Sequence, residues 1–124
     1  PMAMFFLECA AAYFRRNRQP AAEASSPPVP PAYVVLMPAH NESAVISDTL
    51  RDVMPRLSNH GRLLVIADNC TDNTAALARA QGAEVLERTN PVERGKGYAL
   101  DYAVRHLEKE TPPEVVLILD ADCK

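Results

Sequence analysis

The chain alternates between short runs of apolar residues and longer segments in which apolar residues recur every three or four positions. Apolar runs occupy residues 33–37, 63–67 and 115–119, and each has the length of a buried strand. The run at 115–119 is unbroken and predicts a central strand buried on both faces. A mixed segment at 83–88 predicts a further, more exposed strand.

The segments between these strands predict helices. Apolar residues recur at helical spacing over about residues 42–57, 72–81 and 98–110. Strands that alternate with helices of this length form βαβ units and a parallel sheet. Because such crossovers are right-handed, the first and fourth strands should lie side by side, in the order 3-2-1-4. The sequence therefore predicts an α/β fold with a parallel sheet of about four strands flanked by helices.

Polar residues and a glycine mark the ends of the predicted helices. Asn41 or Ser43 can supply the N-cap oxygen of the first helix, and Asp72 can cap the second. Gly82 is expected in the left-handed conformation that ends the second helix. Asp72 is therefore assigned a structural role.

Four carboxylates follow the predicted strands. In open α/β sheets, ligands bind at the carboxyl ends of the strands where the winding direction reverses, here between strands one and four. Glu42 follows the first strand, Asp68 ends the second, and Asp120 and Asp122 follow the fourth. Side chains at i and i+2 of an extended chain point the same way, so Asp120 and Asp122 can reach one site. Carboxylates crowded into one cleft repel each other unless a ligand supplies donors or a metal supplies charge.

The D-x-D formed by Asp120 and Asp122 is suited to a divalent cation. Hard oxygen ligands favour Mg²⁺ or Mn²⁺, which usually leave coordination positions for phosphate oxygens. The alternative is that one aspartate caps the following turn, and a D-x-D alone is a weak signal. A ribose, a base with an imide N–H and a metal-bound diphosphate would together satisfy the four carboxylates.

Four segments carry a family resemblance: residues 38–42 (PAHNE), 67–74 (ADNCTDNT), 94–100 (RGKGYAL) and 120–122 (DAD). In this order and spacing they resemble the nucleotide-binding half of an inverting family 2 glycosyltransferase with the Rossmann-like GT-A fold. The resemblance covers about residue 33 to the end of the chain. It implies transfer of a sugar from a nucleotide-sugar, with a UDP-sugar as the favoured donor, to a glycan or lipid-linked acceptor with inversion.

The resemblance also implies roles for individual residues. Glu42 would contact the nucleoside, and Asp68 would accept from the N–H of the base, which suits uracil better than a purine. Lys96 would lie near the nucleotide, and Arg94 could add positive charge against the diphosphate. Helix capping is the alternative for Glu42, and a solvated loop is the alternative for both basic residues. The other residues predicted to line the nucleotide-sugar site are Pro38, Ala39, Asn69, Asp120 and His40, the last as a loop residue and not a metal ligand.

Two features depart from the family pattern. Many members carry paired acidic residues where this chain has Asp68 and Asn69, so an amide replaces one carboxylate. Family catalysis also needs a later acidic general base and an acceptor-side segment with Gln and Arg-Trp, whereas this chain stops at Lys124 and contains no Trp. The sequence is therefore expected to carry the donor-binding half only, without a visible catalytic residue, and to be inactive in transfer by itself.

Composition narrows the function further. The net charge of −3, with scattered basic residues, gives no case for nucleic acid binding. Cys9, Cys70 and Cys123 show no metal-binding or disulfide spacing, which favours reduced thiols in a cytosolic compartment. Two alternatives stay open: a nucleotidyltransferase on a related fold, and a truncated module that binds nucleotide without turnover. Against the first, residues 38–42 stand where a Gly-rich phosphate loop would follow the first strand.

The segment before residue 33 divides into two parts. Residues 1–18 are apolar and then basic, but the apolar stretch would span only about 20 Å as a helix, against a hydrocarbon core of about 30 Å. It is either the remnant of a membrane helix with its arginines on the cytoplasmic side or an amphipathic helix on the domain or bilayer surface. Residues 19–32 form a Pro/Ala/Ser linker, and 33–124 form the GT-A segment, truncated after the D-x-D. Membrane association, with the catalytic part on the cytoplasmic face, is therefore expected.

Overall fold

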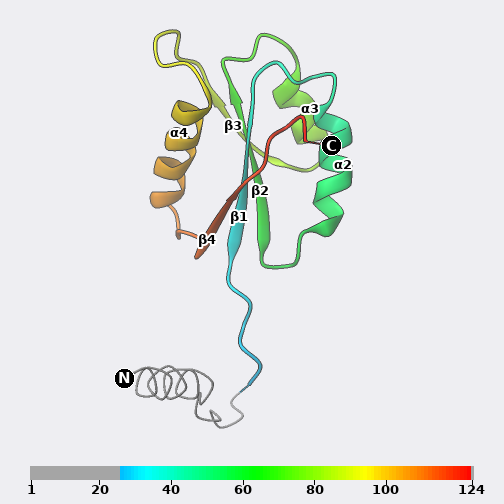
Figure 1. Cartoon of the computed structure of the whole chain (residues 1–124), viewed down its shortest axis with the longest axis vertical. Helices are drawn as coiled ribbons and strands as arrows, with labels where there is room; N and C mark the ends of the chain where they lie inside the picture. The colour runs from blue at the N-terminus through cyan, green and yellow to red at the C-terminus, as the bar shows by residue number, and fades with distance from the viewer. Residues whose placement is uncertain (1–25, 124) are drawn as a thin grey trace, which may run out of the picture.

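A four-stranded parallel sheet forms the centre of the computed structural model, which describes residues 26–123 (Figure 1). The strand order is β3-β2-β1-β4, with every neighbouring pair parallel. This confirms the predicted α/β class and the predicted order 3-2-1-4. The strands are β1 (Tyr33–Ala39), β2 (Gly61–Asp68), β3 (Glu84–Arg88) and β4 (Val115–Ile118).

Helices cover both faces of the sheet. On one face lie α2 (Ile46–Val53), continued by the short 3-10 helix η1 (Met54–Arg56), and α3 (Thr74–Ala80). On the other face lies α4 (Lys96–Glu108), so the strands are held between two helical layers (Figure 1). No helix within residues 26–123 has the length and apolar character needed to cross a membrane. The segment of residues 1–18, for which a membrane or surface helix is predicted, lies outside the described residues. Residues 26–32 of the predicted linker have no regular secondary structure.

The alternation of side chains along β1 and β2 builds two apolar layers. Successive residues of a strand point to opposite faces of the sheet. Odd-numbered residues of both strands pack against Ile46 and Leu50 of α2 and Ala78 of α3. Even-numbered residues pack under α4, in a layer that contains Val34, Leu36, Leu64, Ile66, Ala99, Ala103 and Leu107. The two central strands are thus buried on both sides, as their unbroken apolar runs predict.

β4 does not fit the prediction of a central strand buried on both faces. It is an edge strand that pairs only with β1, and its four side chains are 38% to 56% exposed. The helix on its side of the sheet, α4, packs over β1, β2 and β3. An apolar run indicates a strand, but the exposure of that strand depends on which layers cover it. Here no layer formed by the described residues covers β4.

The first helix begins later than predicted. The structure starts α2 at Ile46, because Glu42 is in a turn in which its carbonyl accepts hydrogen bonds from the N–H groups of Val45 and Ile46. Val45 occupies the N-cap position and provides no side-chain bond. The N-cap role predicted for Asn41 or Ser43 is therefore wrong. Glu42 precedes α2 by four residues and does not open it.

The other helix ends agree better with prediction. Gly82 has a φ of 86°, the left-handed conformation expected after α3, and its N–H donates to the carbonyl of Arg79. In contrast, α4 begins two residues earlier than the predicted start at residue 98. Lys96 is consequently the first residue of a helix and not part of a solvated loop.

Asp72 joins the start of α3 to the loop after β1. Its carboxylate accepts from the N–H and hydroxyl of Thr74, the first residue of α3, and from the N–H of Ser43. It does so from one position before the N-cap residue Asn73. These hydrogen bonds, led by the one from the Thr74 hydroxyl, lower the pKa of Asp72 to about 2. Asp72 therefore has a structural role at the start of α3, as predicted, but the N-cap position predicted for it belongs to Asn73.

We expect Asp72→Asn to destabilise the fold in a pH-dependent way. The folded pKa of about 2 lies below the ordinary 3.8, so the ionised group adds stability above about pH 4 and loses it as pH falls toward 2. The difference in unfolding free energy between wild type and variant should therefore shrink over this range. Urea titrations from about pH 7 to about pH 2 measure it. A constant difference would contradict the role of the ionised carboxylate.

Candidate functional site

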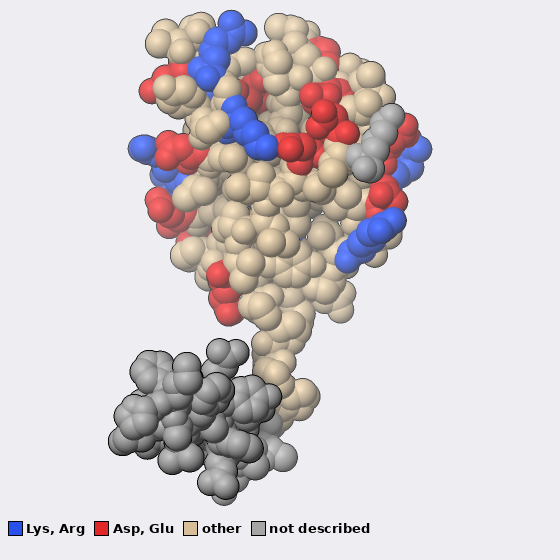
Figure 2. Space-filling model, in the orientation of Figure 1, with Lys and Arg blue, Asp and Glu red and all other residues tan. Residues whose placement is uncertain are grey.

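A cavity of about 460 Å³ opens where β1, β2 and β4 end. Charged side chains of both signs gather at this end of the molecule, at the top of the view in Figure 2. The cavity lies at the reversal of winding between β1 and β4, the position predicted for a ligand site. Its lining includes every residue proposed from the sequence: Pro38, Ala39, His40, Glu42, Asp68, Asn69, Arg94, Lys96, Asp120 and Asp122.

The loop after β1 is held from behind by hydrogen bonds to the next strand and helix. The Nδ1–H of His40 donates to the carbonyl of Asp68, at 2.8 Å, which leaves Nε2 without the proton in a neutral ring. The N–H of Glu42 donates to the hydroxyl of Thr74, at 2.9 Å, and Thr74 is fully buried. Glu42 itself is half-buried at the cavity wall. Thr74 therefore fixes the backbone of Glu42, a role that the sequence did not indicate.

Two asparagines turn the chain at the ends of β1 and β2. Asn41 and Asn69 have φ values of 51° and 50°, a left-handed conformation that asparagine tolerates better than most residues. The Asn41 amide oxygen accepts from the N–H of Thr71, at 2.8 Å. The Asn69 amide oxygen accepts from the N–H of Asn90, also at 2.8 Å. Asn69 thus does more than replace a carboxylate, because it fastens the loop between β3 and α4 to the end of β2.

Cys70 packs between the same two loops. Its thiol lies 3.5 Å from the carbonyl of Ala39, to which it donates, and 3.4 Å from the N–H of Asn41. Burial raises the pKa of the Cys70 thiol, which keeps it protonated and able to donate. Cys70 therefore has a structural role, because its thiol connects the loops that follow β1 and β2.

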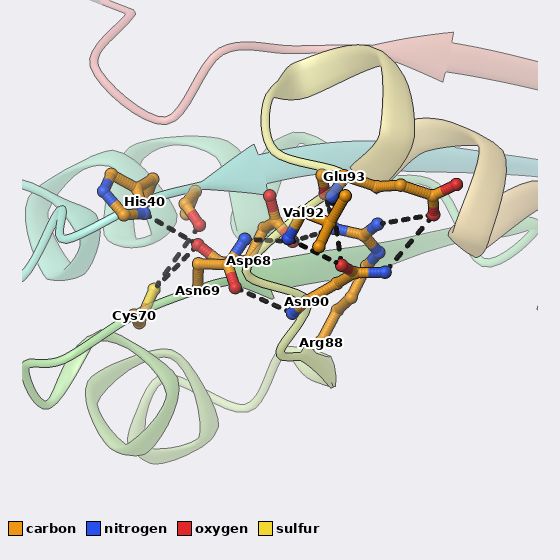
Figure 3. A network of polar contacts seen from close by, with 9 residues as sticks. His40, Asp68, Asn69, Cys70, Arg88, Asn90, Val92 and Glu93 are labelled. Carbon is orange, nitrogen blue, oxygen red and sulfur yellow. Dashed lines mark hydrogen bonds and ion pairs between the residues drawn. The ribbon is translucent and has the colours of Figure 1, made fainter.

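Asp68 forms a buried ion pair that the sequence analysis missed. One carboxylate oxygen, Oδ1, accepts from Nη1 of Arg88 at 2.7 Å, and both side chains are 7% exposed (Figure 3). Removing one partner of such a pair typically costs about 3–5 kcal/mol, because it leaves a buried charge uncompensated. The strand pattern places Leu86 and Arg88 on one face of β3, but the register that sets Arg88 opposite Asp68 is known only from the structure.

Arg88 also organises the loop between β3 and α4. Its Nη1 donates to the carbonyl of Glu93 at 2.8 Å, and its guanidinium lies 5.9 Å from the centre of the Tyr98 ring. The Asn90 side chain accepts from two backbone N–H groups of the same loop (Figure 3). The loop that carries Arg94 and leads to Lys96, the first residue of α4, is thereby tied to the ends of β2 and β3.

The same loop brings a second cation to the acidic side of the cavity. The ammonium group of Lys96, at the start of α4, pairs with Oδ1 of Asp120. Gly95, at the N-cap position, has φ 113° and ψ 168°, a region that only glycine adopts without strain. Two carboxylates of the site, Asp68 and Asp120, are thus compensated by cations of the protein itself.

The D-x-D does not have the extended geometry expected from the sequence. Residues 120–123 form a turn in which the N–H of Cys123 donates to the carbonyl of Asp120, at 3.2 Å. Ala121 is buried, and its carbonyl accepts from the hydroxyl of Thr49 on α2, at 2.7 Å. Asp120 and Asp122 are therefore not alternate residues of an extended chain, and the predicted geometry is wrong here. The turn nevertheless places both Asp120 and Asp122 at the cavity.

These two carboxylates fit a divalent cation that shares its ligands with a bound phosphate. Within residues 26–123, no three or more His, Cys, Asp or Glu side chains gather into a metal-binding group. Asp120 and Asp122 supply hard oxygen atoms, and Mg²⁺ commonly binds through one or two carboxylates with water and phosphate oxygens. The residues present suit Mg²⁺ or Mn²⁺ bound together with a diphosphate, and not a closed protein cage.

The geometry and the sequence of this site agree with a known family. Residues 34–124 match the family described as glycosyl transferase family 2. This chain belongs to that family. Two curated relatives are similar to it: the low-salt glycan biosynthesis hexosyltransferase Agl6 of Haloferax volcanii, 33% identical over 77% of this chain, and glucosyl-3-phosphoglycerate synthase of Mycobacterium tuberculosis, 32% identical over 71%. The chain spans about a quarter of the length of these relatives, 22% and 28% respectively.

Two solved structures of sugar-transferring enzymes are similar to this chain in fold. The M. tuberculosis glucosyl-3-phosphoglycerate synthase in complex with Mn²⁺, UDP and glucosyl-3-phosphoglycerate matches with a TM-score of 0.63 at 30% identity, over 74% of this chain and 34% of that one. A mannosyltransferase from Pyrobaculum calidifontis in complex with GDP-Man and Mn²⁺ matches with a TM-score of 0.62 at 25% identity, over 98% and 37%. Both structures contain Mn²⁺ and a nucleotide or nucleotide-sugar, with different bases.

We expect the two glycines beside Lys96 to respond oppositely to alanine. Gly95→Ala should destabilise the fold by about 1–3 kcal/mol, because its backbone conformation is strained for any residue with a Cβ. Gly97→Ala is the matched control: it lies inside α4 with nothing within 4 Å of an added Cβ, so it should stabilise by about 0.5–1 kcal/mol. Urea unfolding measures both. Equal effects would contradict the assigned backbone of the loop.

Proposed function

We propose that this chain is the donor-binding part of a glycosyltransferase that takes a UDP-sugar together with Mn²⁺ or Mg²⁺. The observation that carries this proposal is a single cavity lined by Asp68 on one side and by Asp120 and Asp122 on the other. A nucleotide-sugar has a base with N–H donors at one end and a diphosphate that binds metal at the other. The two kinds of carboxylate suit the two ends of such a ligand.

Asp68 and Glu42 form the proposed nucleoside end of the site. Asp68 would accept a hydrogen bond from the imide N–H of uracil, since Arg88 already holds the other side of its carboxylate. Glu42 would contact the nucleoside from the loop after β1. Pro38 and Ala39 add apolar surface, which small-molecule sites combine with a few polar groups.

The diphosphate would lie between the D-x-D and the start of α4. Asp120 and Asp122 would hold the cation, which when bound would neutralise the departing nucleoside diphosphate. Lys96 and Arg94 stand at the N-terminal end of a helix of thirteen residues, where the helix dipole favours an anion. Lys96, paired with Asp120 in the structure, would turn to the phosphates once the cation compensates that carboxylate.

The acceptor half of the proposal rests on the family and the sequence. We propose a glycan or lipid-linked acceptor, with the sugar transferred with inversion. The apolar and basic residues 1–18 support association with a membrane, with the catalytic part on its cytoplasmic face.

Binding of nucleotides to the 124-residue chain tests the donor assignment. With Mn²⁺ present, UDP should bind more tightly than ADP by roughly tenfold, because adenine has no ring N–H to donate to Asp68. Isothermal titration calorimetry measures both affinities. Equal or tighter binding of ADP would remove the uridine assignment.

Asp122→Asn should abolish the Mn²⁺-dependent part of UDP affinity, because the amide removes one anionic oxygen ligand of the cation. Asp48→Asn is the control, since Asp48 lies on α2 beside a neighbouring small cavity that Asp122 also lines, and pairs with exposed Arg51. The control should bind as wild type does. Unchanged Mn²⁺-dependent affinity in Asp122→Asn would show that the D-x-D holds no metal.

A further inference from the structure

We propose that Arg88 is a positioning residue that sets the choice of nucleobase, by occupying one oxygen of Asp68 and leaving the other for the base. The proposal rests on the proposed function, in which Asp68 accepts from the base. Arg88 itself does not line the donor cavity, but its guanidinium pairs with Asp68, which does. It acts through Asp68.

The two oxygens of the Asp68 carboxylate have different surroundings. Oδ1 accepts from Nη1 of Arg88 at 2.7 Å and lies 3.5 Å from the side-chain nitrogen of Asn69. Among the hydrogen bonds of residues 26–123, none involves Oδ2. No fully buried side-chain oxygen or nitrogen of the same residues lacks a partner, so Oδ2 is not fully buried and accounts for part of the small exposed area of Asp68. One acceptor atom is thus engaged and the other is available.

Arg88 approaches Asp68 from the side away from the donor site. Asp68 lines the donor cavity, whereas Arg88 lines a separate cavity of about 480 Å³ together with Tyr98 and Tyr102 of α4. The close view shows the guanidinium of Arg88 to the right of Asp68, among the residues of the β3–α4 loop (Figure 3). A base that enters the donor cavity therefore meets Oδ2, while Oδ1 stays covered.

The position of Arg88 is fixed by contacts other than Asp68. The carbonyl of Glu93 accepts from Nη1 at 2.8 Å, the Glu93 carboxylate lies 3.6 Å from Nη2, and the Tyr98 ring lies 5.9 Å from the guanidinium carbon. Both members of the pair with Asp68 are buried, so separating them would leave an uncompensated charge. A ligand cannot displace Arg88 from Oδ1 without breaking this set of contacts.

A carboxylate with one free oxygen distinguishes uracil from guanine. The uracil edge presents a single N–H between two carbonyl groups, so one acceptor satisfies it. The guanine edge presents a ring N–H and an amino group side by side, which a carboxylate matches with both oxygens. If Oδ1 is held by Arg88, the amino group of guanine loses this partner, and a donor without a partner is costly to bury.

The fold itself leaves the choice of base open. Structures similar to this chain contain UDP in one case and GDP-Man in another. In this chain, a side chain behind the carboxylate makes the selection.

Calorimetry with UDP, GDP and IDP in the presence of Mn²⁺ tests the proposal. IDP has the ring N–H of GDP but lacks its amino group. Wild type should prefer UDP to GDP and should bind GDP no more tightly than IDP. In Arg88→Met the preference for UDP over GDP should fall roughly tenfold, and GDP should bind more tightly than IDP. Arg88→Lys, which keeps one charged donor for Oδ1, should restore the wild-type order.

Arg62→Met is the matched control. Arg62 joins β2 to β3 through Glu84, with contacts of 2.9 Å and 2.7 Å, at the end of the sheet away from the cavity. Its loss removes an ion pair between the same two strands and should leave the order of the three nucleotides unchanged. A change in base preference in Arg62→Met equal to that in Arg88→Met would overturn the specific role of Arg88.

The outcomes separate this inference from the proposed function. A wild type that binds UDP preferentially, with the same preference in folded Arg88→Met, would overturn the inference alone. If Arg88→Met does not fold, the wild-type affinities decide. Wild type that binds GDP roughly tenfold more tightly than IDP would show that both oxygens of Asp68 reach the base, and this would overturn the inference. Failure of wild type to bind any uridine nucleotide would overturn the proposed function as well.

Discussion

The buried ion pair between Asp68 and Arg88 is the interaction on which the arrangement of the site depends. It joins the ends of β2 and β3, and the same guanidinium holds the carbonyl of Glu93 in the loop that leads to α4. That loop places Lys96 beside Asp120. Arg88, which lies outside the cavity, thereby sets the positions of Asp68 at one end and of Lys96 at the other. Because both partners are buried, the loss of either one would leave an uncompensated buried charge.

Charge compensation explains how four carboxylates can share the cavity. Repulsion between like charges that are only partly solvated would otherwise work against the folded state. Arg88 compensates Asp68 permanently, since both are buried, whereas Lys96 and Asp120 are about half exposed and their pairing is weak in solvent. The first pair is suited to a fixed framework. The second is suited to exchange with a ligand that brings a cation and an anion together.

β4 shows how a functional turn can be supported by an edge strand. The strand pairs with β1 alone and exposes its side chains, but its backbone continues into the D-x-D. The turn is anchored separately, because the hydroxyl of Thr49 on α2 donates to the carbonyl of buried Ala121. The position of Asp120 and Asp122 therefore depends on a helix and a strand that are far apart in the sequence.

The sequence by itself determined the strands and their order, and its resemblance to a family pointed to most of the residues that line the cavity. Apolar runs, helical spacing and right-handed crossovers fix the strands and their order, because these follow from local periodicity and chain connectivity. The tertiary structure alone decided the pairing of Asp68 with Arg88, the turn at residues 120–123, the late start of α2 and the exposure of β4. Each of these depends on which distant groups meet, and a side chain's partner or cover is a property of packing that local pattern does not contain.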